Sequence, residues 1–485
     1  MLDLLTAGRR RPDAPAVWWD DGSPLTYREL GRMVDVAAGV LGTGRKSLVL
    51  CGGDRDLPTL VSYLAALRQG HTVAFLPATR EVIDAYQPEY LVPEPGAATV
   101  PEGYVPAETG EPGITMLRRK GGPAGADIYE DTAVLLGTSG STGSPKVARL
   151  SYDGVRGNAD SVVSTLGITP EDRIATTLPI RYTYGLSNIT THLRAGAGIV
   201  LTSAPPASLK MWRTLLRSRA TTYAAVPSTY EVLGDRHFAL LEESAIHTMT
   251  QSGGRLRDAV ALDLWQRMDR RQSRFFVMYG QTEATARITC LAPEQLPERL
   301  GSVGTPLPGV QLTIASAGSQ PPAAEAEGEI HYQGHVMLGY ARSRPDLSKG
   351  ADVDILATGD IGRLRDGFLY ITGRAKRMAK ILGHRVSLDE LERLIDRPDS
   401  PVAVVSTHDE VIGLVGSGAP DVLEEQRRTL LDLLGVPNRH VRSVWLADIP
   451  RTENEKVDYA TLTRTFAGAH PVTSPDDGSH GRWGK

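Results

Sequence analysis

The sequence predicts an α/β protein with a large N-terminal domain of mixed, mostly parallel sheets, a β-rich subdomain at its end, and a small α+β C-terminal domain. Three observations predict this arrangement. Up to about residue 226, short apolar strand-like runs alternate with helix-period stretches, which is typical of βαβ units. After Gly301, glycines and prolines separate short strand-like runs, which favours antiparallel pairing. Near Gly373 and Arg374 the pattern changes again, and a new helix start follows.

The N-terminal half supplies its elements in order. A helix is predicted after Thr26, because Thr26 and Glu29 have the spacing of a capping box and apolar residues then recur at helical spacing from Leu30 to Leu41. Buried strands are predicted at residues 47–51 and 72–76, with a helix at residues 57–67 between them. The same alternation continues through residues 198–201 and 222–226.

The second half divides into two pieces. Strand-like runs at residues 310–314 and 329–332 belong to the β-rich subdomain. Beyond residue 374, Ser387 and Glu390 form a second capping box, and a helix over about residues 422–434 ends at Gly435. We therefore expect an N-terminal domain of residues 1–374, a C-terminal domain of residues 375–467, and a disordered tail of residues 468–485.

Length and composition restrict the class of protein. The chain has 485 residues, and one hydrophobic core serves roughly 250–300. Its 53 basic and 57 acidic residues give a net charge of −4, so no basic field for non-specific binding of nucleic acid is expected. Two cysteines exclude a disulfide framework. The sequence shows neither a signal peptide nor an apolar run of about 18 residues. We expect a cytoplasmic monomer or homodimer without a nucleic-acid or membrane partner.

A loop rich in hydroxyls and glycines follows the apolar strand at residues 133–136. Glycine lets a backbone approach a ligand closely, and loop N–H and O–H groups supply the donors that a polyphosphate needs. The P-loop pattern does not fit, because Pro145 stands where its second glycine would fall and Val147 follows the lysine. A surface linker is the alternative. The phosphate-binding candidates are Thr138, Ser139, Gly140, Ser141, Thr142, Gly143 and Lys146.

This loop begins a series of motifs that resembles the adenylate-forming superfamily, which contains acyl-CoA synthetases, adenylation domains of non-ribosomal peptide synthetases, and luciferases. The series continues at residues 279–283, 301–309, 328–340, 358–360, 373–374, 383–385 and 450–456. The resemblance implies an AMP-binding domain with a mobile C-terminal lid. It also implies an enzyme that activates a carboxylic acid as acyl-AMP, releases pyrophosphate and passes the acyl group to a thiol, with ATP and Mg²⁺ as cofactors.

The motif at residues 279–283 suits a magnesium nucleotide. The ring of Tyr279 can stack on a purine, the hydroxyl of Thr282 can donate to a phosphate oxygen, and the Glu283 carboxylate is a hard oxygen ligand for Mg²⁺. Taken alone, the motif would also fit a turn that closes a strand. The resemblance implies that Asp360 accepts from the ribose diol and that Arg374 supports the ribose. The further nucleotide-binding candidates are Gly253, Gly254, Arg255, Gly280 and Gln281, with Arg255 standing where the family commonly has a small residue.

Lys456 corresponds to the catalytic lysine of the family. Attack of a carboxylate on the α-phosphorus brings two anions together, and a compact cation on a long stem stabilises the transition state. Glu455 stands where the family usually has glycine, and we expect it to disturb the loop or to weaken the lysine. The resemblance also implies a hinge at Lys376, a thiol path beside Gly383, and a less defined role for Lys380.

Residues 178–187 resemble the acid-pocket element of the family, with Tyr182 standing where many acyl- and aryl-CoA ligases have histidine. No Asp or Glu occurs between Arg173 and Tyr230, and a buried ammonium without a counter-ion would be unfavourable. A free amino acid is therefore disfavoured, and an aryl, α,β-unsaturated or medium-chain acid is expected. Packing of the tyrosines in the core is the alternative. The candidates are Tyr182, Tyr184, Gly185, Tyr230, Ser252 and Gly253.

The acceptor of the acyl group remains open between two thiols. Coenzyme A is the first expectation, and the phosphopantetheine of a free-standing acyl carrier protein is the alternative. An amine or another nucleophile is a third acceptor within the same fold. A member that binds nucleotide or acyl ligand without catalysis is disfavoured by Lys456, Glu283 and the hydroxyl-rich loop.

Overall fold

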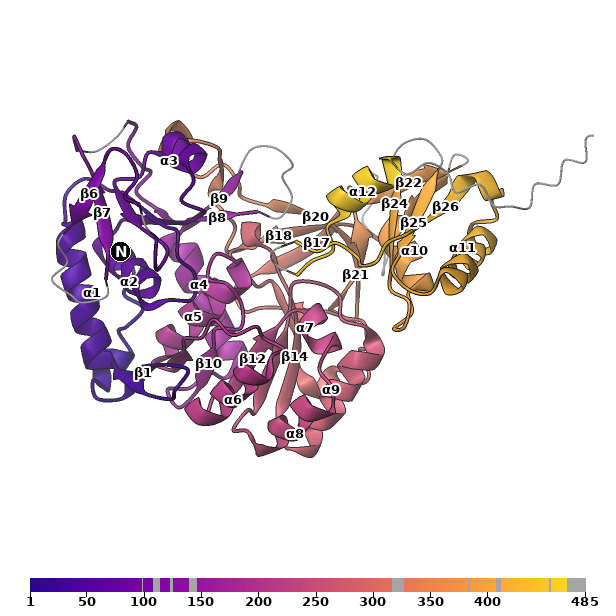
Figure 1. Ribbon diagram of the computed structural model, residues 1–485, viewed down its shortest axis with the longest axis horizontal. Coiled ribbons are helices and arrows are strands. Elements are labelled where there is room, and N and C mark those ends of the chain that lie inside the picture. Colours follow the sequence, from indigo (N-terminus) through magenta and orange to yellow (C-terminus); the bar gives the residue numbers. More distant parts are fainter. Residues whose placement is uncertain are drawn as a thin grey trace, which may run out of the picture. The chain divides into compact units, whose positions relative to one another are not determined.

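The computed structural model describes residues 1–97, 99–107, 114–122, 125–138, 146–315, 327–381, 384–406, 411–452 and 455–468. The chain forms two compact units: Met1–Thr358 with Gly362–Ile371, and Gly359–Ile361 with Thr372–Lys485. Both units combine helices with sheets (Figure 1), which confirms the α/β class. The expected tail was residues 468–485; Gly468 is the last residue of helix α12 (Tyr459–Gly468), and residues 469–485 lie outside the described residues. No helix in the described part of the chain is long and apolar enough to cross a membrane.

The first unit contains an eight-stranded sheet with a parallel centre. Its strands β3, β4, β5 and β8 run parallel, and antiparallel strands extend it at both edges. The order is β19 (Gly339–Ala341), β9 (Val147–Ser151), β8 (Thr132–Gly137), β4 (Thr72–Phe75), β3 (Leu48–Cys51), β5 (Tyr90–Val92), β7 (Met116–Arg119) and β6 (Tyr104–Ala107).

A nine-stranded sheet forms the second large layer of this unit, and its strands β12, β13 and β14 also run parallel. The order is β16 (Thr305–Pro306), β15 (Thr289–Leu291), β14 (Arg274–Tyr279), β13 (Thr248–Gln251), β12 (Thr222–Ala225), β10 (Arg173–Ala175), β11 (Gly198–Val200), β1 (Pro15–Trp18) and β2 (Pro24–Thr26). A four-stranded sheet, β17 (Gln311–Ala315), β18 (Gly328–Gln333), β20 (Leu356–Arg365) and β21 (Phe368–Arg374), is the β-rich part that the glycine and proline spacing predicted.

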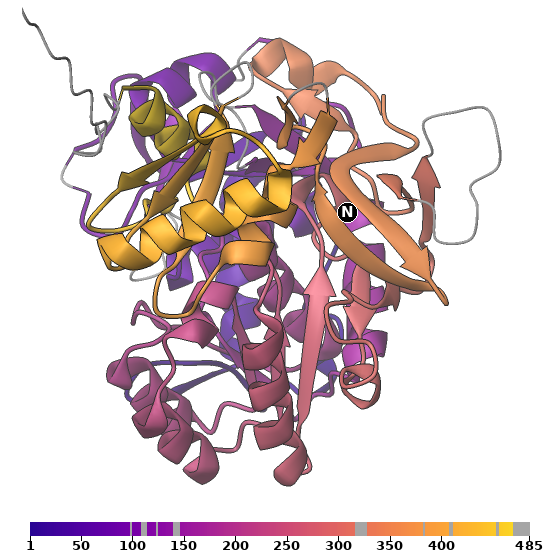
Figure 2. The ribbon, with the colours of Figure 1, turned by 90° about the vertical axis from the view of Figure 1, so that its right-hand side faces the viewer.

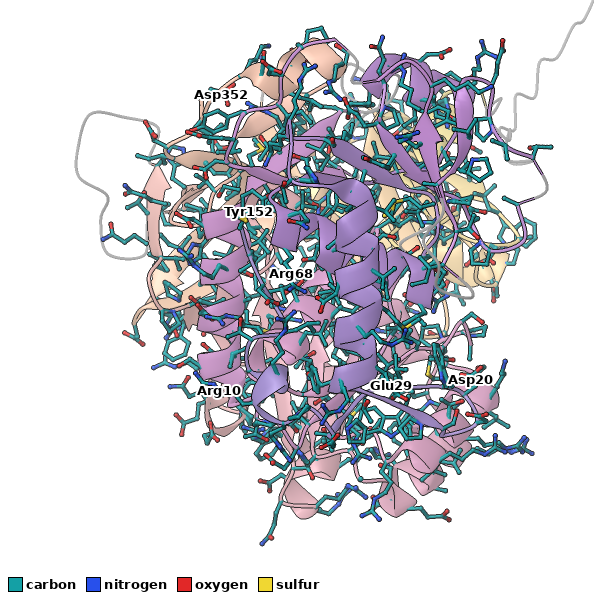
Figure 3. All side chains as sticks on the ribbon, turned by 90° about the vertical axis from the view of Figure 1, so that its left-hand side faces the viewer. Arg10, Asp20, Glu29, Arg68, Tyr152 and Asp352 are labelled. Carbon is teal, nitrogen blue, oxygen red and sulfur yellow. The ribbon has the colours of Figure 1, made fainter. Side chains whose placement is uncertain are left out.

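Two helix pairs lie between the large sheets. In the first pair, α1 (Tyr27–Leu41) packs on β1 and α2 (Leu57–Gln69) packs on β3 and β4. In the second pair, α4 (Tyr152–Leu166) packs on β8 and β9, and α5 (Thr183–Ala195) packs on β10 and β11. The capping box at Thr26 and Glu29 is present at the start of α1. The Tyr152 hydroxyl (Figure 3) donates to the carbonyl of His71 at 2.6 Å, which fixes α4 beside β4.

The remaining short elements of this unit connect and cover the sheets. They are α3 (Arg80–Tyr86), α6 (Leu209–Ser218), α7 (Pro227–Glu231), α8 (Asp235–Glu243), α9 (Asp258–Arg270) and the 3-10 turns η1 (Gly8–Arg10), η2 (Thr282–Ala284), η3 (Pro293–Gln295) and η4 (Arg344–Ser348). A bidentate ion pair from Arg344 of η4 to Glu89, at 2.8 and 3.0 Å, is buried beside β5.

The second unit is built on a three-stranded sheet with apolar faces on both sides. Its elements are β22 (Met378–Ile381), β23 (His384–Ser387), α10 (Leu388–Ile395), β24 (Val402–Ser406), β25 (Ile412–Gly416), α11 (Pro420–Leu434), η5 (Asn438–His440), β26 (Val441–Trp445) and α12 (Tyr459–Gly468). Helices α10 and α11 cover one face of β24–β25–β26, and α12 covers the other. Figure 2 shows α11 lying along the sheet. Ser387 caps α10 by accepting from the Glu390 N–H, which is one half of the predicted capping box, and Gly435 ends α11, as predicted, in a left-handed conformation.

Candidate active site

The site begins at the carboxyl ends of parallel strands. In the register of β13 and β14, Gln251 lies opposite Val277. The segments that follow these strands, residues 252–255 and 279–283, therefore emerge at the same edge of the sheet. Ligands of α/β proteins bind at the edge formed by the carboxyl ends of the strands, among the loops that follow them. This register brings together two segments that the resemblance to the family selected.

The turn after β14 is tightly closed. The Ile288 N–H donates to the Tyr279 carbonyl at 2.8 Å. A Cβ on Gly280 would lie 1.7 Å from the Ala286 carbonyl oxygen, so only glycine fits there. Thr285 and Ala286 hold φ values of 56° and 109°, and such conformations cost of order 1–3 kcal/mol each. The turn is therefore strained and determined by its surroundings.

Two contacts from the segment after β18 hold this strained turn. The Thr285 hydroxyl donates to the His335 carbonyl at 2.7 Å, and the Met337 N–H donates to the Glu283 carbonyl at 2.8 Å. The Thr282 hydroxyl lies 2.5 Å from the Thr183 hydroxyl at the start of α5. The candidate phosphate donor is thereby placed beside the segment expected to hold the acid.

Glu283 belongs to a chain of three side chains from separate elements. The Tyr340 hydroxyl donates to Glu283 Oε1 at 2.8 Å, and Lys146 Nζ lies 3.3 Å from the centre of the Tyr340 ring. Burial, reinforced by the Glu283 charge, raises the pKa of Tyr340, so the phenol keeps its proton and donates. Sequence analysis quoted Gly339 and Tyr340 within a motif but assigned Tyr340 no role.

The ends of the hydroxyl-rich loop are described, and its centre is not. The Thr138 hydroxyl donates to the Lys146 carbonyl at 3.4 Å. The candidates Ser139, Gly140, Ser141, Thr142 and Gly143 lie outside the described residues.

Gly253 and Tyr182 meet at the edge of the expected acid pocket. Gly253 holds φ at 91°, and a Cβ there would lie 2.3 Å from the Tyr182 hydroxyl oxygen. Ser252 is buried, and the Gly254 carbonyl accepts from the Gln251 side chain at 2.7 Å. Arg255 is exposed and pairs with Asp258 of α9 at 3.2 Å.

The other two tyrosines are tied into the core. Tyr184 and Tyr230 are 4% and 2% exposed, and both hydroxyls donate to the Thr250 carbonyl at 2.9 Å. Tyr230 packs edge-on against Tyr223 and Phe275, so its ring is part of the core. Tyr184 spans from α5 to β13 and contacts Tyr182 edge-on, with ring centres 6.4 Å apart.

Gly185 allows the first turn of α5 to pack closely. A Cβ at Gly185 would lie 2.1 Å from the Pro179 carbonyl oxygen. Beneath this turn is a cavity of about 20 Å³, which is room for about one water molecule. Its polar lining is Asn158, Thr183, Ser187, Thr190 and Thr285.

In the second unit, the two ribose candidates are paired with each other. Arg374 Nε lies 3.3 Å from Asp360 Oδ1, and the Ala375 N–H donates to the Gly359 carbonyl at 2.8 Å. Lys376 and Lys380 are exposed, and Gly383 lies outside the described residues.

The loop before Lys456 is a closed turn. The Thr452 N–H donates to the Lys456 carbonyl at 2.7 Å, and the Glu455 N–H donates to the Thr452 carbonyl at 2.9 Å. Glu455 holds φ at 60°, a left-handed conformation that glycine adopts freely and other residues do not. The backbone therefore keeps the geometry of a glycine turn although the residue is glutamate.

A cluster that the sequence did not indicate connects the start of α12 with the segment after Arg374. The Arg377 guanidinium lies 3.4 Å from the centre of the Tyr459 ring and forms ion pairs with Asp389 and Glu392, at 2.5 and 3.0 Å. The Tyr459 hydroxyl donates to Glu392 at 2.6 Å. The sequence does not indicate this cluster, because an Arg or Tyr in a polar segment is usually solvated and has the same local pattern as one that is paired.

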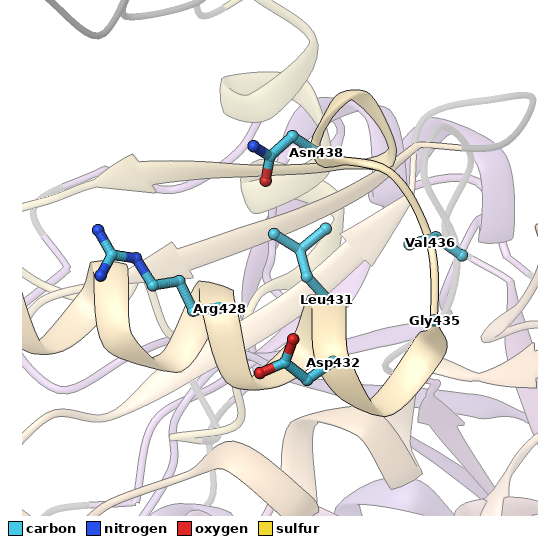
Figure 4. Close-up of a pocket in the computed structure, with 6 residues that line it drawn as sticks. All are labelled: Arg428, Leu431, Asp432, Gly435, Val436 and Asn438. Atoms are coloured by element: carbon cyan, nitrogen blue, oxygen red, sulfur yellow. The ribbon is translucent and has the colours of Figure 1, made fainter. Parts of the chain in front are cut away.

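The donor set agrees with magnesium held beside phosphates. Among the described residues, no group of three or more His, Cys, Asp or Glu side chains could enclose a metal. A site with one carboxylate, Glu283, fits Mg²⁺, which keeps waters and binds through one or two carboxylates and phosphate oxygens. A hollow in the second unit, lined by Arg428, Leu431, Asp432, Gly435, Val436 and Asn438 (Figure 4), contains none of the predicted site residues.

Comparison with known proteins identifies the family of the chain. The model of the AMP-binding enzyme family matches residues 98–341. The chain is 29% identical to the non-ribosomal peptide synthetase CmlP of Streptomyces venezuelae, over 99% of this chain and 51% of CmlP, so it spans about half the length of that relative. It is 28% identical to the indoleacetate–CoA ligase of Aromatoleum aromaticum, over 81% of this chain and 82% of that protein.

A solved structure gives the same fold. The o-succinylbenzoate CoA synthetase of Bacillus subtilis, in complex with its acyl-adenylate intermediate, matches with a TM-score of 0.74 at 22% identity over 95% of this chain and 97% of that chain. The same enzyme in complex with ATP and magnesium ion matches with a TM-score of 0.71. The chain belongs to the family of AMP-binding enzymes, whose model matches half of its length.

Proposed function

We propose that this ligase activates an aryl, α,β-unsaturated or medium-chain acid and passes the acyl group to a thiol, with CoA as the first acceptor. The observation that supports the adenylation site best is the strained turn that fixes Thr282 and Glu283 at the strand edge, with Tyr340 and Lys146 behind the carboxylate. Bound MgATP supplies the electrophilic α-phosphorus, and Glu283 would hold the metal.

Residues of the protein position the carboxylate of the acid and the α-phosphate of ATP for reaction. Thr282 donates toward a phosphate oxygen, and the hydroxyl-rich loop supplies further donors. We assign Asp360 and Arg374 to the ribose and Tyr279 to the adenine. We propose that residues 375–467 form a lid that turns at Lys376. One lid position brings Lys456 to the α-phosphate, and another opens the thiol path beside Gly383.

Two acceptors compete, and each has support. The likeness to indoleacetate–CoA ligase covers most of both chains and favours CoA. The likeness to a non-ribosomal peptide synthetase favours the phosphopantetheine of an acyl carrier protein. Mass spectrometry of the product formed with CoA or with a loaded carrier distinguishes the two. An amine acceptor would appear as an amide product.

The test of the adenylation step uses two matched variants. Lys456→Ala is expected to abolish ATP–pyrophosphate exchange across a panel of carboxylic acids and to leave thiol transfer from supplied acyl-AMP intact, because the lysine acts only where two anions meet. Lys210→Ala, at an exposed lysine paired with Asp20, is the control and should change neither step. Equal loss of both steps in Lys456→Ala would contradict the assigned role.

A further inference from the structure

Arg287, shortly after Glu283, is a buried cation without a carboxylate partner among the described residues. Its side chain is 2% exposed. One of its nitrogens, Nη2, donates to Asn188 Oδ1, and the other two, Nε and Nη1, have no hydrogen-bond partner. Burial lowers the pKa of the guanidinium, which still remains charged at neutral pH.

Two other arginines in the described part of the chain are fully buried, and the charge of each is compensated by partners. Arg344 is also 2% exposed, and it binds Glu89 with two hydrogen bonds. Arg149 donates to three backbone carbonyls and lies 3.8 Å from Asp352. A buried ion costs several kcal/mol unless an opposite charge and hydrogen bonds compensate it. Arg287 lacks the opposite charge that both of the others have.

The position of Arg287 connects it with the acid-binding segment. Its guanidinium lies 4.9 Å from the centre of the Tyr184 ring. The residue before Tyr184 is Thr183, whose hydroxyl contacts that of Thr282 at 2.5 Å. The aromatic contact contributes about 0.5–2 kcal/mol, which is less than the desolvation of a full charge. Residues 174–229 contain no acid, so this segment offers no carboxylate that could neutralise Arg287.

We propose that Arg287 selects acids that carry a second anionic group, such as a dicarboxylate, and that this group is the missing partner of the buried guanidinium. The inference rests on the proposed function, because it concerns the acid that the adenylation site takes. The second carboxylate accepts charge-assisted hydrogen bonds from Nε or Nη1, the two nitrogens without a partner. A monocarboxylate leaves the cation as unpaired as before.

The experiment compares acids that differ by one carboxylate. ATP–pyrophosphate exchange is measured with succinate against butyrate, glutarate against valerate, and phthalate against benzoate. At least one diacid is expected to exceed its partner by about 100-fold in kcat/KM, the order of effect seen when a buried charge pair is broken. Equal values within every pair would overturn the inference.

Two variants test the residue itself. Arg287→Met is expected to lower the ratio of the diacid value to the monoacid value by about 100-fold, whereas Arg287→Lys keeps part of the preference. Arg156→Met, at an exposed arginine, is the control. Thermal unfolding shows whether Arg287→Met folds, and the preferred diacid alone should raise the melting temperature of the wild type but not of this variant. A parallel loss for both acids would contradict the inference.

The outcome separates the inference from the proposed function. If monoacids support exchange as well as their paired diacids do, the proposed function is supported and the role of Arg287 is rejected. If no acid supports exchange, the proposed function is wrong. The change in melting temperature on adding an acid then tests the anion site at Arg287 separately. A shift specific to diacids that is lost in Arg287→Met supports the anion site, and no shift or an equal shift rejects it.

Discussion

Replacing Tyr340 with phenylalanine removes one hydroxyl and leaves the ring that lies against Lys146. The hydroxyl donates to Glu283 at 2.8 Å, and a hydrogen bond to a charged group contributes about 1.5–3 kcal/mol. If this bond fixes the carboxylate for the metal, its loss should lower kcat/KM for ATP about 10- to 100-fold. The Mg²⁺ concentration for half-maximal exchange should rise, because the freed carboxylate must be ordered again on binding.

The assay is ATP–pyrophosphate exchange with one accepted acid while the Mg²⁺ concentration is varied. Tyr340→Leu also removes the ring, and with it a cation–π contact of about 0.5–2 kcal/mol, so it should lose several-fold more activity than Tyr340→Phe. Tyr90→Phe, which removes a weaker bond of 3.3 Å to the Val40 carbonyl, is the control. An unchanged or lower Mg²⁺ requirement in Tyr340→Phe would refute the positioning of Glu283 by this hydroxyl.

Two predictions concern stability. Glu455→Gly should raise the free energy of unfolding of the C-terminal unit by up to about 1 kcal/mol, because glycine adopts the left-handed φ of 60° without strain. Urea unfolding measures this change, and a lower free energy of unfolding would contradict the prediction. The His192 Nδ1–H donates to the Asn188 carbonyl at 2.8 Å, its Nε2 has no partner, and burial lowers its pKa to about 4. Between pH 6.5 and 4 this histidine is therefore protonated in the unfolded chain and neutral in the folded protein. The free energy of unfolding should then fall by about 2 kcal/mol from pH 7.5 to pH 5. His192→Gln should lose most of this pH dependence in urea unfolding, and an unchanged dependence would show that another group causes it.

Local signals predicted the elements well, because their causes lie within a few residues. The capping box at Thr26 and Glu29 and the stop at Gly435 appear where the sequence indicated. Thr282 and Glu283 became candidates through the resemblance of residues 279–283 to a motif of the family.

Local signals failed where the partner is distant in the chain. Tyr340 reaches Glu283 across 57 residues, and nothing near either residue indicates the contact. Tyr230 was expected at the acid pocket, and the structure places its ring between Tyr223 and Phe275 in the core. An apolar-aromatic pattern does not distinguish a pocket wall from a core, because both are buried surfaces.

The sequence by itself determined the alternation of strands and helices, the positions of the caps, and the order of the nucleotide-binding motifs. These depend on backbone preferences and on spacing of side chains along one element. Only the tertiary structure decided which buried charges are compensated: Arg344 meets Glu89, whereas Arg287 meets a ring and an amide. The physical reason is that the free energy of a buried charge depends on neighbours that only packing brings within a few ångströms.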